Sequence, residues 1–132
     1  IEAARTLWPK KEIWLIFQPH QYQRTLALFD QFVQTLSTIP VDRVVLTDIF
    51  DVPGREGKGI KKKVSSKKLK EAIKKPHVEH IPELRDVEVF LKENKKKDRI
   101  MIVMGAGSIY SVTEELTNIN RIVIPAKAGI QS

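Results

Sequence analysis

Residues 13–36 read IWLIFQPHQYQRTLALFDQFVQTL, and the change of pattern within this stretch decides the fold. The first five residues form a short, unbroken apolar run, which is typical of a strand buried on both faces, as parallel strands are. After Pro19 the spacing changes, and residues 22–36 repeat their apolar side chains at helical intervals, which predicts a helix with one apolar stripe. The stripe consists of Leu26, Phe29, Phe32, Val33 and Leu36.

The same alternation of strand and helix continues to the end of the chain. Because such alternation implies right-handed crossovers, we predict an α/β fold with a mostly parallel sheet of about five to six strands and helices on both faces. The segment rich in proline and glycine, residues 51–63, is predicted to be a loop. The further strands are expected within 41–50 and at 78–81, 100–104 and 122–124, and the further helices at 65–74 (capped by Ser65 or Ser66), 82–94 and 108–116.

The chain has 132 residues and a net charge of +7, and the charge is concentrated in one segment. Nine lysines and one acid lie between Lys58 and Lys75, so this window carries +8 and the rest of the chain −1. Two interpretations stay open: a solvated charged face, or a surface that binds a polyanion. The window contains no aromatic residue for stacking and no arginine for reading bases, which argues against nucleic acid as a partner.

Composition excludes several other classes. Without cysteine the chain has no disulfide, thiolate metal site or thiol nucleophile. No apolar run approaches the ~18 residues that span a bilayer, and no signal peptide is recognisable, so we expect a cytoplasmic protein with no membrane contact. His77 and His80 would point to opposite faces of a short strand, so we expect edge histidines and no metal site. The first residue is Ile1 and not Met, which indicates a piece of a longer protein.

Ligands of an open α/β sheet meet the loops at the carboxyl ends of its strands. His20 follows the first strand, and Arg24 comes one helical turn later, so both can face an anion held at that point. The alternative is that His20 caps the helix and Arg24 is a surface residue. After the predicted strand at 100–104, the turn Gly105-Ala106-Gly107 brings backbone close to a ligand or simply connects strand and helix, with Ser108 as the cap. The spacing is not that of a dinucleotide site, and the chain has no phosphate-binding P-loop.

Four stretches together resemble the third domain of the Mur ligases, and in particular of their L-alanine-adding branch. The resemblance covers residues 1–118, which we take as one domain, and leaves residues 119–132 as an edge strand with a disordered, non-family tail. The stretches are Phe17-Gln18-Pro19-His20 with Tyr22, Arg24 and Thr25, continuing through Leu28-Phe29-Asp30 to Phe32; Asp48-Ile49-Phe50 with Arg55 and Glu56; the predicted helix from Ser65 to Ile73; and Met104 to Ile109.

This resemblance implies a Rossmann-like domain that closes over the cleft of an ATP-dependent ligase of peptidoglycan biosynthesis. ATP and Mg²⁺ would be held mainly by a central ATPase domain and the UDP-sugar by an N-terminal domain, so the third domain alone would be inactive. His20, Gln21 and Arg24 would form the L-alanine site, with Arg24 pairing the carboxylate. The family usually has arginine where this chain has Gln21, which removes one charge from the site. The cleft would also be lined by Tyr22, Thr25, Gly105, Ala106, Gly107 and Ser108, with no metal ligand among them.

Three alternatives remain. One is the ligase that recycles murein tripeptide, against which the Pro19-His20 pair and the Gly105–Gly107 turn argue. The second is a lysine-rich module that binds a polyanion through residues 58–75. The third is a degenerate gene product that folds without a role.

Overall fold

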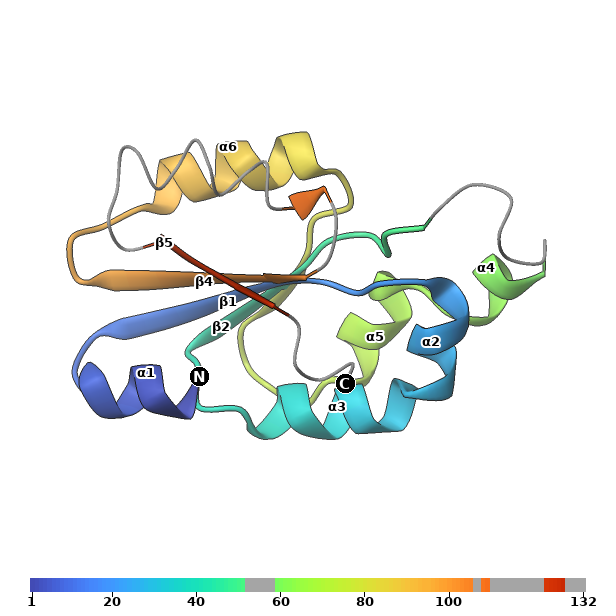
Figure 1. Ribbon diagram of the computed structural model, residues 1–132, viewed down its shortest axis with the longest axis horizontal. Coiled ribbons are helices and arrows are strands. Elements are labelled where there is room, and N and C mark those ends of the chain that lie inside the picture. The colour runs from blue at the N-terminus through green and yellow to red at the C-terminus, as the bar shows by residue number, and fades with distance from the viewer. Residues whose placement is uncertain (52–58, 106–107, 110–122, 128–132) are drawn as a thin grey trace.

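The structure is a computed structural model that describes residues 1–51, 59–105, 108–109 and 123–127. Five parallel strands form one sheet in the order β3-β2-β1-β4-β5 (Figure 1). This confirms the predicted α/β fold, and the strand order is that of a Rossmann-like sheet. The strands are β1 (Glu12–Gln18), β2 (Arg43–Leu46), β3 (Val78–His80), β4 (Arg99–Gly105) and β5 (Val123–Lys127).

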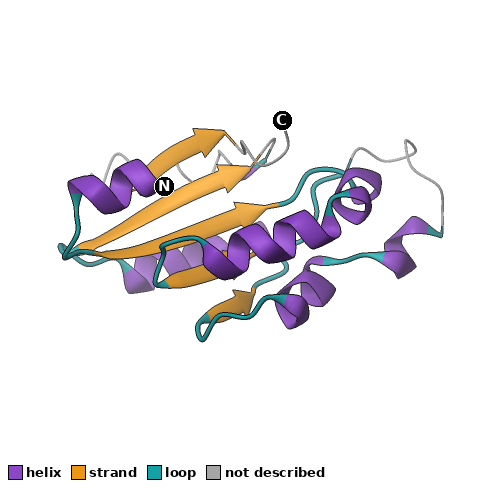
Figure 2. Cartoon of the chain, turned by 90° about the horizontal axis from the view of Figure 1, so that it is seen from below, coloured by secondary structure: helices purple, strands orange, loops and turns teal. Residues whose placement is uncertain are grey.

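Helices cover both faces of the sheet. In Figure 1, α6 lies above the sheet, whereas α1, α3 and α5 lie below it, and α2 and α4 sit at the end towards which β1 runs. Figure 2 shows the strands pointing the same way between these layers. The helices are α1 (Glu2–Leu7), α2 (Tyr22–Ala27), α3 (Phe29–Thr38), α4 (Ile60–Lys63), α5 (Ser66–Ala72) and α6 (Leu84–Asn94). None of the helices in the described ranges is both long and apolar enough to cross a membrane.

Alternate residues of β1 supply the two halves of the core. Ile13, Leu15 and Phe17 pack with side chains from α3 and α5, while Trp14 and Ile16 pack with side chains from α6. All five are buried, which is what a continuous apolar strand needs when both faces are covered. The predicted cap is also present, because the Ser65 side chain accepts a hydrogen bond from the amide of Lys68 at 3.1 Å.

Three local predictions need correction or lie outside the described residues. The helix predicted at 22–36 is interrupted at Leu28 and continues to Thr38. The segment predicted to be a loop, residues 51–63, ends in a helical turn, α4. Lysine favours helix, but the turn has no apolar stripe, so hydrophobic periodicity does not reveal it. Of the helix predicted at 108–116, only residues 108–109 are described, and Ile109 is buried.

Helix α1 was not predicted, and none of its residues is fully buried. Ala4, with Ile1 and Trp8 at the two ends of the helix, packs against the core. Arg5 also attaches the helix to the sheet. The Arg5 guanidinium donates to the carbonyl of Pro40 at 3.2 Å and of Lys11 at 2.9 Å, and pairs with the carboxylate of Asp42 at 2.8 Å.

Candidate functional site

The order in which strands are added to the sheet reverses between β1 and β4. The predicted site residues lie in the loops that follow these two strands. In this sheet the strand that follows β3 is added on the other side of β1, and open α/β sheets bind their ligands at the carboxyl ends of the two strands where this reversal occurs. Gln18, the last residue of β1, lies opposite Gly105, the last residue of β4. The His20 loop therefore leaves the sheet beside Gly105, the first residue of the glycine turn.

His20 is held by the loop that follows β2. Its imidazole stacks on the Phe50 ring with centroids 5.5 Å apart and planes 22° from parallel. The backbones of the two residues form an isolated parallel bridge, with the amide of Phe50 donating to the carbonyl of Pro19 at 2.8 Å. The half-buried ring of His20 is thus fixed on one side by an aromatic surface.

Gln21 joins this loop to α2 in an unusual conformation. Its φ of 65° and ψ of 131° make it the one non-glycine residue with positive φ in the described part of the chain. Its amide donates to the carbonyl of Phe50 at 2.7 Å, and its carbonyl accepts the amide of Thr25 at 3.0 Å and the Thr25 hydroxyl at 2.7 Å. Backbone strain of this kind persists only where surrounding contacts fix it, and it is concentrated at functional sites.

The remaining predicted residues of α2 have different surroundings. The side chain of Arg24 is exposed, and within the described ranges its guanidinium makes no hydrogen bond or ion pair. Tyr22 lies under the ammonium of Lys61, which is 5.5 Å from the centre of its ring. Thr25 is fully buried, so it supports the loop and does not line a cleft.

The glycine turn is described only at its two ends. A Cβ on Gly105 would lie 3.0 Å from the carbonyl oxygen of Gln18, so a side chain there would push the two strand ends apart. Ala106 and Gly107 lie outside the described residues, and Ser108 is exposed. Gly105 therefore keeps the His20 loop and this turn close together.

A polar network that the sequence did not predict joins the ends of β2 and β3. The Nε2 atom of His80 lies 2.7 Å from Oδ1 of Asp48, and the Thr47 hydroxyl donates to the carbonyl of Pro82 at 2.8 Å. The Ser66 hydroxyl donates to the carbonyl of Thr47 at 2.6 Å. His80 lies on the edge strand as expected, but it pairs with Asp48, and nothing in the sequence spacing indicates this partner. His77 is exposed.

Two carboxyl groups with lowered pKa lie at the opposite ends of the strands from the His20 loop, one before β2 and one at the start of β1. Burial raises the pKa of Asp42, but hydrogen bonds from the Ile13 amide and the Arg5 guanidinium outweigh it and leave this pKa below its ordinary value. The other group is Glu12, which Arg99 contacts at 2.8 Å. These groups stabilise the fold and are remote from the His20 loop.

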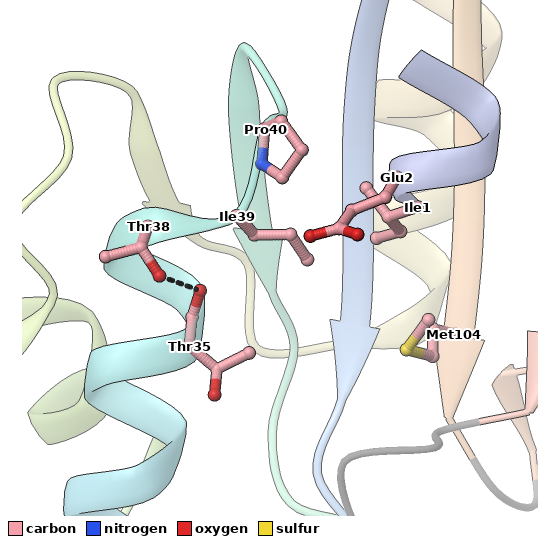
Figure 3. A pocket seen from close by; sticks show the side chains of 7 residues that line it. All are labelled: Ile1, Glu2, Thr35, Thr38, Ile39, Pro40 and Met104. Carbon is pink, nitrogen blue, oxygen red and sulfur yellow. Dashed lines mark hydrogen bonds between the residues drawn. The ribbon is translucent and has the colours of Figure 1, made fainter. Parts of the chain in front are cut away.

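Figure 3 shows a cavity of about 340 Å³ between α1, α3 and β4. Its walls are mainly aliphatic, and none of the predicted site residues lines it. Across the described part of the chain, no three acidic or histidine side chains come together as a metal site. The cavity is lined by Ile1, Glu2, Thr35, Thr38, Ile39, Pro40 and Met104.

Comparison with known proteins identifies relatives over most of the chain. It is 39% identical over 111 residues to a UDP-N-acetylmuramate–L-alanine ligase of Lachnospira eligens, covering 83% of this chain and 23% of that protein. It is 36% identical over 123 residues to the enzyme of that name from Caldanaerobacter subterraneus, covering 92% and 25%. The enzyme of that name from Desulfotalea psychrophila is 32% identical over 119 residues, covering 88% and 25%.

The chain thus spans about a quarter of the length of these relatives. A comparison with descriptions of whole protein families gives no match. The chain belongs to the Mur ligase family, and its sequence fits the C-terminal domain of a UDP-N-acetylmuramate–L-alanine ligase.

Proposed function

We propose that this chain is the amino-acid-binding, cleft-closing domain of an ATP-dependent ligase that joins L-alanine to UDP-N-acetylmuramate in the cytoplasm. The observation that carries the proposal is the position of His20 and Arg24. They follow β1 at the point where the strand order reverses, beside the turn that begins at Gly105. An open α/β sheet binds its ligand at this point.

The side chains of the site would contact different parts of a small zwitterion. Arg24 is exposed and unpaired within the described ranges, so its guanidinium is free to hold the L-alanine carboxylate with two parallel hydrogen bonds. His20 presents an imidazole whose plane is set by Phe50. Gln21 contributes a neutral amide where the family usually has a cation, so the carboxylate depends more strongly on Arg24.

The remaining chemistry belongs to partner domains. The described residues bring no three metal-ligating side chains together, and the sequence has no P-loop, so we assign ATP and Mg²⁺ to a central domain and the UDP-sugar to an N-terminal domain. ATP supplies the activation of the sugar carboxyl group. This chain holds the amino acid in position for attack, which is catalysis by orientation. Alone, it should form no product.

A domain exchange tests the proposal. The chain replaces the matching C-terminal quarter of the Lachnospira eligens enzyme, and ADP formation is measured with UDP-N-acetylmuramate and either L-alanine or a murein tripeptide. We expect activity that depends on L-alanine in the chimera and none in the isolated chain. Activity with the tripeptide alone would assign the domain to murein recycling, and turnover by the isolated chain would contradict the proposal.

Arg24 provides the matched variant. In the chimera, Arg24→Gln should raise the KM for L-alanine by about ten- to a hundredfold, because one charge-assisted contact is lost. Arg85 is also exposed but lies on α6, so Arg85→Gln should change this KM by less than about twofold. Equal effects of the two substitutions would remove Arg24 from the site.

A further inference from the structure

A second hollow combines apolar and cationic walls. It has a volume of about 400 Å³ and lies between the α2–α3 junction and the segment that carries α4 and α5. None of the residues of the proposed L-alanine site lines it, so it can be tested separately. It is lined by Leu26, Ala27, Phe29, Asp30, Lys63 and Lys68.

The two lysines of this groove occupy defined positions. The ammonium of Lys68 donates to the carbonyl of Lys62 at 2.6 Å, which ties the start of α5 to α4. An ammonium has three donors, so two remain for a ligand. Lys61, on the same turn as Lys63, lies over the Tyr22 ring and holds α4 beside α2. The cationic wall is therefore fixed against the apolar one.

The lysines around the groove share it with one carboxylate, that of Asp30, but are not engaged in ion pairs with described residues. Within the described part of the chain, no lysine from 61 to 75 forms an ion pair with a carboxylate. All three lysines of α4 are exposed, as are Lys67 and Lys68 at the start of α5. Such a concentration of unpaired cations attracts anions and holds phosphates in particular.

The composition of the groove selects among anions. Phe29 and Leu26 form an apolar wall that suits a flat heterocycle, and Lys63 and Lys68 suit phosphate oxygens. Asp30 would repel a bare polyanion, whereas it can accept hydrogen bonds from a ribose hydroxyl or an exocyclic amine. We propose that this groove binds a nucleoside diphosphate, with the base on the Phe29 wall and the phosphates at the two lysines.

The fold thereby changes the interpretation of the lysine segment. The sequence between Lys58 and Lys75 contains no aromatic residue, but the fold places Phe29, from a distant segment, in the same groove as Lys63 and Lys68. The nucleotide would use both walls, whereas a solvated lysine face would use neither.

Titration of the ¹⁵N-labelled chain tests the site. The probes are ADP, UDP and inorganic pyrophosphate, each followed by amide chemical shifts of residues 26–30 and 61–68. We expect saturable shifts with ADP or UDP and about tenfold weaker binding of pyrophosphate, because pyrophosphate cannot stack on Phe29. The tighter of the two nucleotides identifies the preferred base. Equal affinities for pyrophosphate and both nucleotides, or no saturable shift, would overturn the proposal.

Three variants separate the site from general attraction to positive charge. Lys63→Gln combined with Lys68→Gln should weaken nucleotide binding about tenfold. The matched control, Lys96→Gln with Lys97→Gln, alters two exposed lysines after α6 and should change affinity by less than about twofold. Equal losses in both pairs would contradict a defined groove.

Asp30→Asn gives the sharpest distinction. It should weaken nucleotide binding and strengthen pyrophosphate binding, since it replaces one carboxylate acceptor with an N–H donor and removes a repulsive charge. A parallel gain for both probes would show that Asp30 only repels anions and would refute the nucleotide assignment. The four substituted lysines and Asp30 are all exposed, so each variant should keep the amide spectrum of the folded chain.

Discussion

His20 stacks on Phe50, with ring centroids 5.5 Å apart, and this contact joins the loop after β1 to the loop after β2. The stack sets the plane of the imidazole at the proposed L-alanine site. It also couples the family-like motif around His20 to the one around Phe50, which lies thirty residues later in the sequence.

Phe50→Leu should therefore weaken amino-acid binding without removing catalysis. Loss of the stack is worth about 0.5–1.5 kcal/mol, so the KM for L-alanine in the domain-exchange enzyme should rise about two- to tenfold. The control is Phe90→Leu, which removes the stack between Phe90 and Trp14 on the α6 face. Phe90→Leu should lower the stability and leave this KM unchanged. If Phe90→Leu raised the KM and Phe50→Leu did not, Phe50 would have no role at the site.

Gly105→Ala should destabilise the domain by about 1–3 kcal/mol, as overpacking does. The new Cβ would lie 3.0 Å from both the Gln18 carbonyl oxygen and Cγ2 of Ile109, and backbone cannot give way cheaply. Urea unfolding measures the effect.

Gly59 is the matched position for this substitution. Within the described residues, and apart from its chain neighbours, no atom lies within 4 Å of a Cβ built there, and its φ of −81° and ψ of −15° suit any residue. Gly59→Ala should stabilise the chain by about 0.5 kcal/mol, because it restricts the unfolded state. If both alanine variants changed the stability equally, close packing at Gly105 would not be the cause.

The sequence predicts the strands well because their apolar runs depend on burial alone. The run from Ile13 to Phe17 identifies β1, and all of it is buried. It does not predict α1, whose position depends on the contacts of Arg5 with Pro40 and Asp42, more than thirty residues away. Single-sequence periodicity contains no information on such contacts.

The sequence likewise predicts one part of the candidate site and not the other. His20 and Arg24 follow from a local motif at a strand end, and the sheet places that end at the reversal of strand order. The stacking of His20 on Phe50 and the pairing of His80 with Asp48 arise from loops that meet only after folding. Motifs therefore identify the residues, but the sequence does not give their partners.

Gln21→Gly should stabilise the domain by about 1 kcal/mol. A non-glycine residue at φ 65° costs of order 1–3 kcal/mol, and glycine removes this cost while losing somewhat more entropy on folding. The control is Gln31→Gly, at an exposed position within α3, which should destabilise by about 1 kcal/mol. Opposite signs for the same substitution would identify backbone strain, whereas two losses would show that Gln21 is unstrained.

Asp42→Asn should make the stability less dependent on acid pH. The carboxylate accepts hydrogen bonds from the Ile13 amide and from Arg5, both at 2.8 Å, and its pKa in the folded state is lowered. A lowered folded-state pKa means that the charge stabilises the fold above the unfolded-state pKa of about 3.9, and that this contribution disappears as the pH falls through the folded-state value. The wild-type chain should exceed the variant by about 1 kcal/mol at pH 7, a modest amount because Asp42 is 46% exposed.

The difference between the two proteins should begin to shrink near pH 4, where the unfolded wild-type chain takes up the proton, and should disappear only below the lowered pKa of folded Asp42, where both proteins carry a neutral side chain at this position. Urea unfolding at a series of pH values measures it. Asp98→Asn, at an exposed carboxylate before β4, should differ from the wild-type chain by less than about 0.5 kcal/mol at every pH. A wild-type advantage at Asp42 that persisted unchanged to pH 2 would have to come from packing of α1 and not from the charge.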